Sequence, residues 1–414
     1  MLRPPFCPNR DCPCHIDPDS PDTHRLASSP WFKLNGSYST TVRGPVRRFK
    51  CLVCGQGFSE QTFTLDYYVK RIIDYHWVQR SVCNCSGVRA TARQMGCSCD
   101  SVSNRISRLA RQYISAHSRL IAQIKLNEDL AADGFESFAV SQYFPNNIHL
   151  LVGSSSQMVY FCDYVTLRRS GRMRASQKRV RRALEALYLP PPASLTSSFE
   201  ELLDYLSHHL NPSTNQPTTL HTDRKLEYSR AFTSRFSSSH SRLIHQRTDS
   251  RAKRDQDNPL FPVNYIDREF RKDLAEHVRE TVRFARNVNH SMERLWIYLE
   301  NHNLCKRFRI NDPVGIHRTH ATQAGATTAD VSRVTAQLTR RRRFLSFEDL
   351  QPSERRVWCR QHTTPLKGIR KGILRAIGRQ AAGGEVDLES IRRKLGVEKL
   401  IQDARQYLPR YALA

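Results

Sequence analysis

Two kinds of hydrophobic pattern alternate along the chain. Residues 86–112 carry apolar side chains at helical spacing on both sides of Gly96, which predicts two helices joined by a turn. Apolar runs at 148–153 and 157–167 predict two buried strands. Helical spacing returns at residues 287–308, where Met292, Leu295, Trp296 and Leu299 form an apolar stripe. Helices and strands together indicate a multidomain α/β protein.

The segments between these elements differ in composition. Residues 168–217 form a long connection that begins without a single acidic residue between Arg168 and Arg182, and we expect an inserted helical and basic subdomain there. Residues 229–256 are rich in Ser and Arg and predict a loop with one strand near 241–247. The last segment, 311–414, is basic and mainly helical by its pattern, and its role is not indicated.

The helices predicted within 86–112 have the spacing of a helix-turn-helix. Small Ala92 allows a close crossing, and either Ser98 or Asp100 can cap the second helix. That helix has its apolar positions at Val102, Ile106 and Leu109. Its exposed side would present side chains suited to base edges and phosphates, namely Ser101, Ser103, Asn104, Arg105 and Arg108. An ordinary pair of amphipathic helices is the alternative.

Charge narrows the class of partner. The 414 residues include 65 Lys and Arg against 39 Asp and Glu, a formal charge of +26. Such an excess opposes compaction and favours a polyanion partner over a membrane surface, because no segment has the clean apolar face of a membrane-bound helix. The chain has neither an apolar run long enough to span a bilayer nor a signal-peptide pattern at its start, so we expect a cytoplasmic protein.

Cysteines cluster near the amino terminus. Two pairs with short spacing, separated by 38 residues, match the two knuckles of a zinc ribbon; we expect Cys7, Cys12, Cys51 and Cys54 to bind a structural Zn²⁺. Cys14 or His15 could replace Cys12, because spacing alone does not choose between them. The two C-x-C pairs offer ligands for a second metal site: Cys83, Cys85, Cys97 and Cys99.

Carboxylates in the middle of the chain suggest chemistry. Asp133 follows a small-apolar stretch, Asp223 follows a short Thr-Leu-His strand, and Glu293 flanks the apolar stripe of the last helix. Three such oxygen ligands suit two-metal phosphoryl transfer with Mg²⁺ or Mn²⁺, two ions per active site. Glu280 is the rival for the third position. Two other acids have lesser roles, Glu136 as a supporting group and Asp163 as a structural one.

These motifs together resemble bacterial insertion-sequence transposases of the DDE type with an amino-terminal zinc ribbon and helix-turn-helix. The resemblance covers about residues 5–310 and rests on the stretches "CPNRDC", "FKCLVCGQGFS", "SGVRATARQMGCS", "ADGFESF", "LHTDRKLEY", "NPLFPVN" and "ERLWIYLENHNLCK". It implies an RNase H-like catalytic core in which Asp133, Asp223 and Glu293 form the metal-binding triad.

The expected organisation follows from the motifs and the resemblance. It comprises a zinc ribbon at 1–62, a helix-turn-helix domain at 63–125, an RNase H-like mixed-sheet core at 126–310 with its insertion at about 168–217, and a helical tail at 311–414. The expected function is a transposase that binds double-stranded DNA at the ends of its own element. It would cleave 3′ ends and join them to target DNA, acting as a homodimer or larger assembly. The alternatives are a DNA-binding regulator without catalysis and a metal-dependent nuclease that cuts without joining.

Overall fold

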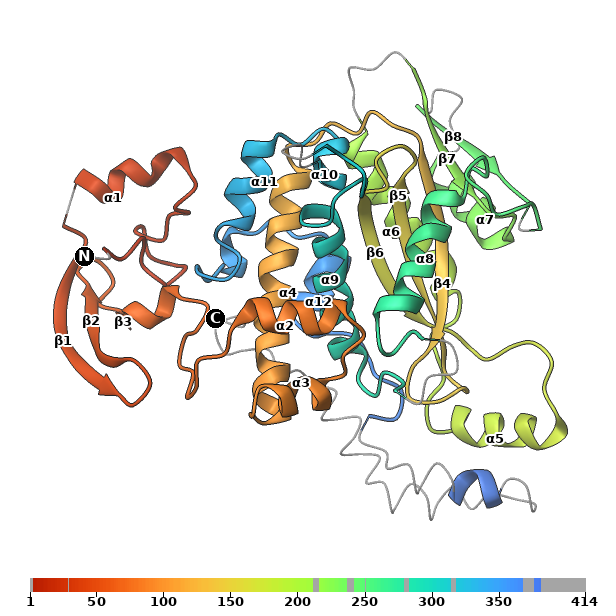
Figure 1. Cartoon of the computed structure of the whole chain (residues 1–414), viewed down its shortest axis with the longest axis horizontal. Helices are drawn as coiled ribbons and strands as arrows, with labels where there is room; N and C mark the ends of the chain where they lie inside the picture. Colours follow the sequence, from red (N-terminus) through yellow and green to blue (C-terminus); the bar gives the residue numbers. More distant parts are fainter. Residues whose placement is uncertain are drawn as a thin grey trace.

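Three structural parts follow one another along the chain: a small amino-terminal sheet, a group of helices and a larger mixed sheet (Figure 1). The computed structural model describes residues 3–28, 30–210, 216–236, 242–249, 251–278, 283–313, 318–367 and 376–380. The residue proposed as a rival for the third carboxylate, Glu280, lies outside these ranges.

The amino-terminal part is a three-stranded antiparallel sheet. Its strands are β1 (Phe32–Thr40), β2 (Gly44–Cys51) and β3 (Gly57–Ser59), in the order β1-β2-β3. Short helical turns flank it: η1 (Pro21–Thr23), α1 (His24–Ser28) and η2 (Glu60–Phe63). This part has a hydrophobic cluster of its own. The cluster contains Cys7, Cys12, Cys14 and Cys51, whereas Cys54 is exposed. Its aromatic side chains include Phe6, Trp31, Phe49, Phe58 and Phe63.

The helical part contains the predicted pair of helices. α2 (Tyr75–Cys83) and α3 (Val88–Gln94) precede a turn at Gly96, which has a φ of +57°, and the long α4 (Cys99–Ile121) follows. Ser98 caps the amino end of α4, and its side chain accepts a hydrogen bond from the Ser101 N–H. Ala92, Val102, Ile106 and Leu109 are all buried, as the pattern predicted.

The larger sheet has five strands. They are β4 (Leu130–Phe138), β5 (Pro145–Gly153), β6 (Val159–Thr166), β7 (Thr218–Thr222) and β8 (Leu243–Arg247), in the order β6-β5-β4-β7-β8. The first three strands pair antiparallel, and β7 and β8 continue the sheet in parallel with β4. The strand predicted near residues 241–247 is therefore present as β8.

Helices cover both faces of this sheet. α6 (Ser194–His209) packs on β5 and β6 and against α7 (Leu226–Arg235), whereas α8 (Phe261–Asp273) packs on β4 and β5. α6 was expected to belong to an insertion, but its apolar side buries Phe199, Leu202 and Leu206 in the main core. Of the expected insertion, only α5 (Ala175–Glu185) lies to the side of the sheet in a small cluster of its own.

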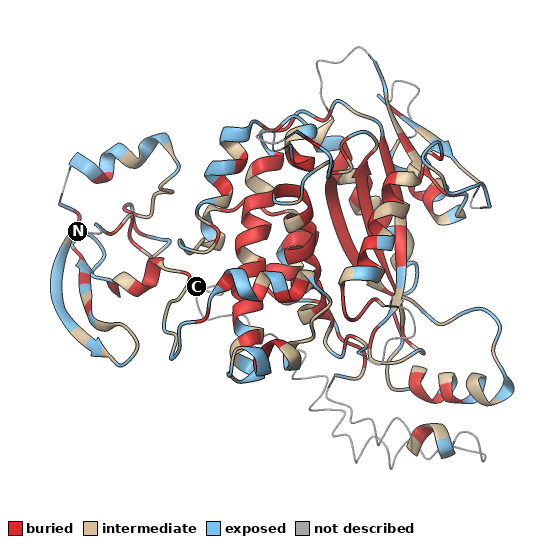
Figure 2. Cartoon of the chain, viewed as in Figure 1, coloured by how far each residue is buried: buried red, intermediate tan, exposed pale blue. Residues whose placement is uncertain are grey.

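The helical part and the sheet share one core. α4 packs along α9 (Val288–Leu304), α9 also contacts β6, and a single buried cluster runs from α2 through the sheet to the carboxyl-terminal helices (Figure 2). These last elements are α10 (His320–Gln323), α11 (Thr328–Thr335), η3 (Leu345–Phe347) and α12 (Pro352–Trp358). Helix α12 packs on α4, α9 and β6. The described part of the tail is therefore integral to the fold.

Within the described ranges, no helix is both long enough and apolar enough to cross a bilayer.

Candidate functional site

Parallel pairing of β4 and β7 brings two of the expected catalytic residues together. Leu130 pairs with Leu220 and Ala131 with His221; continuing this register by two residues brings Asp133 level with Asp223 at the carboxyl end of β7. The next residue of β4 has to be small, because a Cβ at Gly134 would overlap a neighbouring side chain on β5.

A lysine lies between these two carboxylates. The Lys225 Nζ is 3.7 Å from Asp133 Oδ1 and 3.9 Å from Asp223 Oδ2, and it is 3.6 Å from Glu136 Oε1. The Tyr228 hydroxyl donates to Asp133 Oδ1 at 3.3 Å. Burial and the negative charge of Asp133 raise the pKa of Asp223. The site therefore holds more negative charge than a single lysine balances, which is the electrostatic condition that favours a further cation.

A third carboxylate, Asp267 of α8, lies close enough to Asp133 to be affected by its charge. The ring of Phe135 packs edge-on against Phe270 of α8, so Asp133, two positions earlier on the same strand, lies on the face that α8 covers. Burial, followed by the charge of Asp133, raises the pKa of Asp267 to about 8. The Asp267 Oδ1 is buried and has no hydrogen-bond partner among the described residues. An acid with a buried, unpartnered oxygen near the charge of Asp133 fits a cation-binding role.

Glu293 is not part of this group. It is buried on α9, where Arg360 Nε contacts its Oε1 at 2.6 Å and Ser107 Oγ donates to its Oε2 at 2.8 Å. His290 Nδ1 lies 3.2 Å from the same Oε2. Although burial opposes ionisation, His290 and Arg360 hold the pKa of Glu293 below its usual value. Both oxygens are therefore occupied by protein groups that join α9 to α4 and to the segment after α12.

The sequence signal that could have identified Asp267 is weak. It lies on an amphipathic helix directly after the "NPLFPVN" stretch, but a partly buried aspartate on such a helix has no feature that marks it as a ligand. Of the two lesser acids, Glu136 contacts Lys225 at the edge of the site. Asp163 is buried and bonded to Ser198 and Arg356, as its position in mid-strand indicated.

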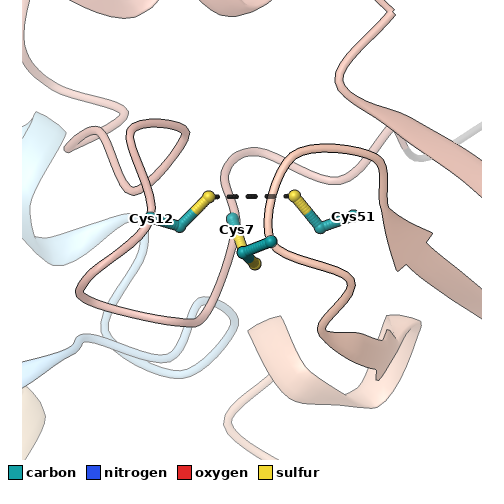
Figure 3. A group of neighbouring side chains, drawn as sticks. Cys7, Cys12 and Cys51 are labelled. Atoms are coloured by element: carbon teal, nitrogen blue, oxygen red, sulfur yellow. Dashed lines mark hydrogen bonds between the residues drawn. The ribbon is translucent and has the colours of Figure 1, made fainter.

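The four amino-terminal cysteines converge as their spacing predicted. The sulfur atoms of Cys7, Cys12, Cys51 and Cys54 all lie within 4.8 Å of one another. Among the described residues, no other group of three or more His, Cys, Asp or Glu side chains brings its ligand atoms this close together. The Sγ atoms of Cys7 and Cys54 are 3.5 Å apart. Those of Cys12 and Cys51 are 3.8 Å apart (Figure 3). Tetrahedral Zn²⁺ with Zn–S bonds of about 2.3 Å separates its sulfurs by about 3.8 Å. The cluster therefore fits a structural zinc ion.

The alternative ligands in the first knuckle have other roles. The Cys14 N–H donates to the Cys12 Sγ at 3.4 Å, an interaction that stabilises a thiolate. The His15 ring bridges the Cys7 carbonyl oxygen, at 2.7 Å, and the Ser346 hydroxyl, at 2.6 Å. Cys14 and His15 thus support the knuckle without joining the sulfur cluster.

Burial makes Cys7 and Cys12 poor acids in the absence of a cation. Desolvation is the main cause that raises the pKa of Cys7 and raises that of Cys12 to about 12. At Cys54, which is more exposed, hydrogen bonds from Gln56 and Asn9 outweigh desolvation and lower the pKa to about 7. Four thiolates at this spacing need a bound cation, which is what a structural Zn²⁺ supplies.

Two residues expected to face DNA are buried instead. Arg105 is 4% exposed and donates to the Arg71 carbonyl, and Arg108 is 7% exposed and donates to the Leu65 carbonyl. The chain that precedes α2 crosses α4 at these positions, which a single helix pattern does not reveal. Ser101, Ser103 and Asn104, near the amino end of α4, remain partly or fully exposed.

No protein-family model matches this chain, and no curated protein matches it.

Proposed function

We propose that this protein is a DNA transposase of the DDE type. A zinc ribbon and a helix-turn-helix would bind the ends of its element, and an RNase H-like core would cleave and join strands. The observation that carries the proposal is the approach of Asp133 and Asp223, which share contacts with the Lys225 ammonium, with Asp267 near enough for the charge of Asp133 to raise its pKa. The sheet supports it: three antiparallel strands followed by two parallel ones, with helices on both faces, is the architecture that an RNase H-like core would have.

The third catalytic carboxylate in this proposal is Asp267 of α8 rather than Glu293. Asp267 has a buried oxygen without a partner, whereas both oxygens of Glu293 are engaged by Arg360, Ser107 and His290. Mg²⁺ or Mn²⁺ bound by the three aspartates would activate a water or a 3′-hydroxyl and stabilise the leaving oxygen.

The protein groups around the triad have definable tasks. Lys225 contacts Asp133 and Asp223 through its ammonium and balances part of their charge. Tyr228 donates to the Asp133 Oδ1 and so orients that carboxylate. Asp133 lies on β4, Asp223 directly after β7 and Asp267 on α8, and these elements pack in the shared core, which keeps the positions of the aspartates fixed.

The deciding experiment is a cleavage assay with the purified chain, labelled DNA from the flanks of its own gene, and Mg²⁺ or Mn²⁺. We expect 3′-end nicking and strand joining that Asp133→Asn, Asp223→Asn and Asp267→Asn each abolish while DNA binding persists. Glu293→Gln is the comparison, and a folded Glu293→Gln protein should still cleave. DNA binding without cleavage by the unaltered chain would favour a DNA-binding regulator, and cleavage without joining would favour a nuclease.

A further inference from the structure

A cleft separates the amino-terminal sheet from α4. Its volume is about 640 Å³, and it is bordered by both cysteine knuckles, by the middle of α4 and by the segment from Arg342 to Trp358. None of the three aspartates of the proposed active site lines it. It is therefore a second concave surface, formed by parts of the chain that are far apart in sequence.

Arginine dominates the lining of this cleft. The lining includes two acids, Asp11 and Glu348, and six arginines: Arg10, Arg108, Arg111, Arg342, Arg343 and Arg355. Asp11 contacts Arg10, and Glu348 contacts Arg119 behind the wall of the cleft. By contrast, Arg108, Arg111 and Arg355 form no ion pair with a carboxylate in the part of the chain that the structure describes. The cleft therefore carries an excess of positive charge that suits a polyanion.

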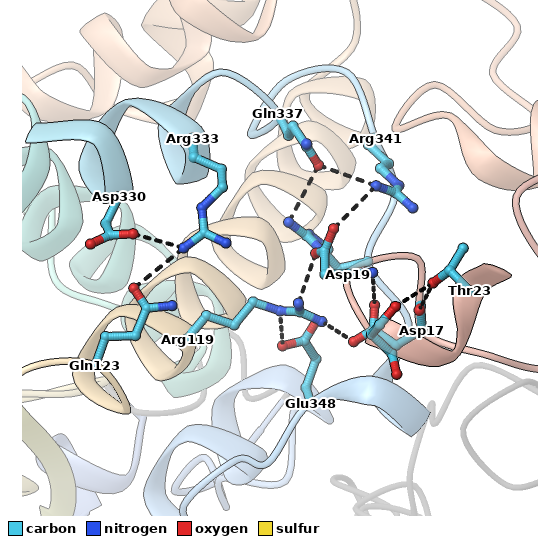
Figure 4. A network of polar contacts seen from close by, with 12 residues as sticks. Asp17, Asp19, Thr23, Arg119, Gln123, Asp330, Arg333, Gln337, Arg341 and Glu348 are labelled. Carbon is cyan, nitrogen blue, oxygen red and sulfur yellow. Dashed lines mark hydrogen bonds and ion pairs between the residues drawn. The ribbon is translucent and has the colours of Figure 1, made fainter. Parts of the chain in front are cut away.

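The walls of the cleft are held in place from behind. Asp19, in the amino-terminal part, contacts Arg119 of α4 at 2.8 Å (Figure 4). It also contacts Arg343 at 2.7 Å. Arg119 also contacts Asp17 at 2.8 Å and Glu348 at 3.2 Å. This network joins all three walls, so the positive groups are fixed before any ligand arrives.

Two of the arginines are ordered by an aromatic ring. The Arg108 and Arg342 guanidinium carbons lie 3.8 Å and 4.0 Å from the centre of the Tyr67 ring. Arg108 is nine-tenths buried, and its Nε has no hydrogen-bond partner among the described residues. A buried, unpartnered donor of this kind on an arginine-lined cleft points to an anionic ligand.

The next residue, Tyr68, is an exposed aromatic side chain on a strained backbone. Its φ is +52°, a conformation that L-residues other than Asn and Asp rarely adopt, and its residue surface is 65% exposed. The buried Gln61 side chain accepts the Tyr68 N–H at 3.0 Å and holds this conformation. Because the ring contributes little to the core, packing does not explain the strain; such strain is typical of a functional position.

We propose that this cleft binds the phosphodiester backbone of a DNA strand and that Tyr68 stacks on an unpaired base of that strand. Arginines interleaved with an exposed aromatic ring are the chemistry that recognises single-stranded nucleic acid, since every base presents a π face. The inference rests on the proposed function for its choice of DNA, and it assigns the contact to a surface other than the amino end of α4.

The test uses the full chain and two labelled DNA probes, a blunt duplex and the same duplex with an unpaired 3′ overhang. Tyr68→Gly removes the ring and relieves the strain, so its melting temperature should not fall. Its affinity for the overhang probe should fall about tenfold, with binding of the blunt duplex changed less than about twofold. Trp77→Ala, which removes a comparably exposed aromatic residue outside the cleft, is the matched control.

The charge is tested separately. Arg111→Gln and Arg355→Gln should each lower the slope of log affinity against log salt by about one for the overhang probe, as expected for a lost phosphate contact. Arg309→Gln removes an exposed arginine outside the cleft and should leave the slope unchanged.

The outcomes separate this inference from the proposed function. If the unaltered chain binds the overhang probe and Tyr68→Gly binds it equally well, the cleft assignment is overturned while the transposase proposal stands. If the cleft variants and the control variants lose affinity for DNA equally, the binding is a general attraction of DNA to a basic protein. That result would also overturn the cleft assignment. Failure of the unaltered chain to bind either probe would remove the DNA partner and with it both proposals.

Discussion

Replacing Glu293 by Gln separates a structural carboxylate from a catalytic one. Glu293 is 2% exposed, and its oxygens contact Arg360, Ser107 and His290 at 2.6–3.2 Å. These contacts tie α9 to α4 and to the chain that follows α12. Glutamine keeps the shape of the side chain but removes the charge that Arg360 faces.

The expected cost follows from the burial of this pair. Breaking a buried ion pair by removing one partner costs about 3–5 kcal/mol. The Arg360 side chain is 28% exposed, so water solvates part of the charge left behind, and we expect the lower end, about 3 kcal/mol. For cooperative unfolding of all 414 residues, that lowers the melting temperature by roughly 3–4 °C.

Asp267→Asn should behave in the opposite way. The pKa of Asp267 is raised to about 8 in the folded chain, so its ionisation lowers the free energy of unfolding as pH rises from about 4 through about 8. Asparagine has no such ionisation. At pH 8 in the absence of divalent cations, the Asp267→Asn protein should therefore be at least as stable as the unaltered chain, and by about 1 kcal/mol more stable if the unpartnered oxygen is costly.

Thermal unfolding followed by fluorescence suits this comparison, because Trp296 of α9 and Trp358 of α12 are buried in the core. Cleavage by both variants is measured in parallel below their melting temperatures. The reasoning is refuted if Glu293→Gln is as stable as the unaltered chain but inactive, or if Asp267→Asn is destabilised and remains active.

Three further predictions concern other parts of the molecule. Cys51→Ser should lose zinc, as measured with a metal-binding dye, and should expose the amino-terminal part to protease, because Cys51 is one of the four clustered sulfurs. Cys14→Ser should retain the metal, because Cys14 is not one of those four. The charge of Glu300, 2.7 Å away, outweighs burial and raises the pKa of His117 to about 9. The contribution of the charged His117 to stability is therefore complete below about pH 6.5 and is lost as pH rises through 9. His117→Gln should remove this pH dependence of the free energy of unfolding, measured by urea titration, at a cost of about 3 kcal/mol. Asp19→Asn should speed proteolytic separation of the amino-terminal part from α4 without changing the zinc content, and unchanged proteolysis would contradict the role given to the network.

Local signals in the sequence were sufficient for several features. Cysteine spacing identified Cys7, Cys12, Cys51 and Cys54, because a tetrahedral ion needs two knuckles of this length and little else. Hydrophobic runs located the strands β5 and β6 and the helices α4 and α9. Asp223 directly follows β7, as its pattern predicted, whereas Asp133 lies in the middle of β4, and only the register of β4 against β7 brings the two level.

Other features depended on which elements meet in space. Periodicity showed that Glu293 flanks a buried stripe, but a helix pattern indicates that a side chain faces the interior and not which partner it meets there. Packing placed α9 on α4 and β6, and it placed α8 on β4 beside Asp133. For the same reason the sequence pattern treated Arg105 and Arg108 as exposed, whereas the chain before α2 covers them.

The sequence by itself therefore determined the chemistry available to this protein: a basic surface, a cluster of four cysteines, and acids within or directly after strands. The tertiary structure alone decided that Asp267 lies near Asp133, and that a cleft lined by arginines lies between the amino-terminal sheet and α4. Ligand spacing and element type are local properties that a few neighbouring residues set. The choice among similar acids is made by contacts between segments far apart in the chain, which depend on the packing of the whole core.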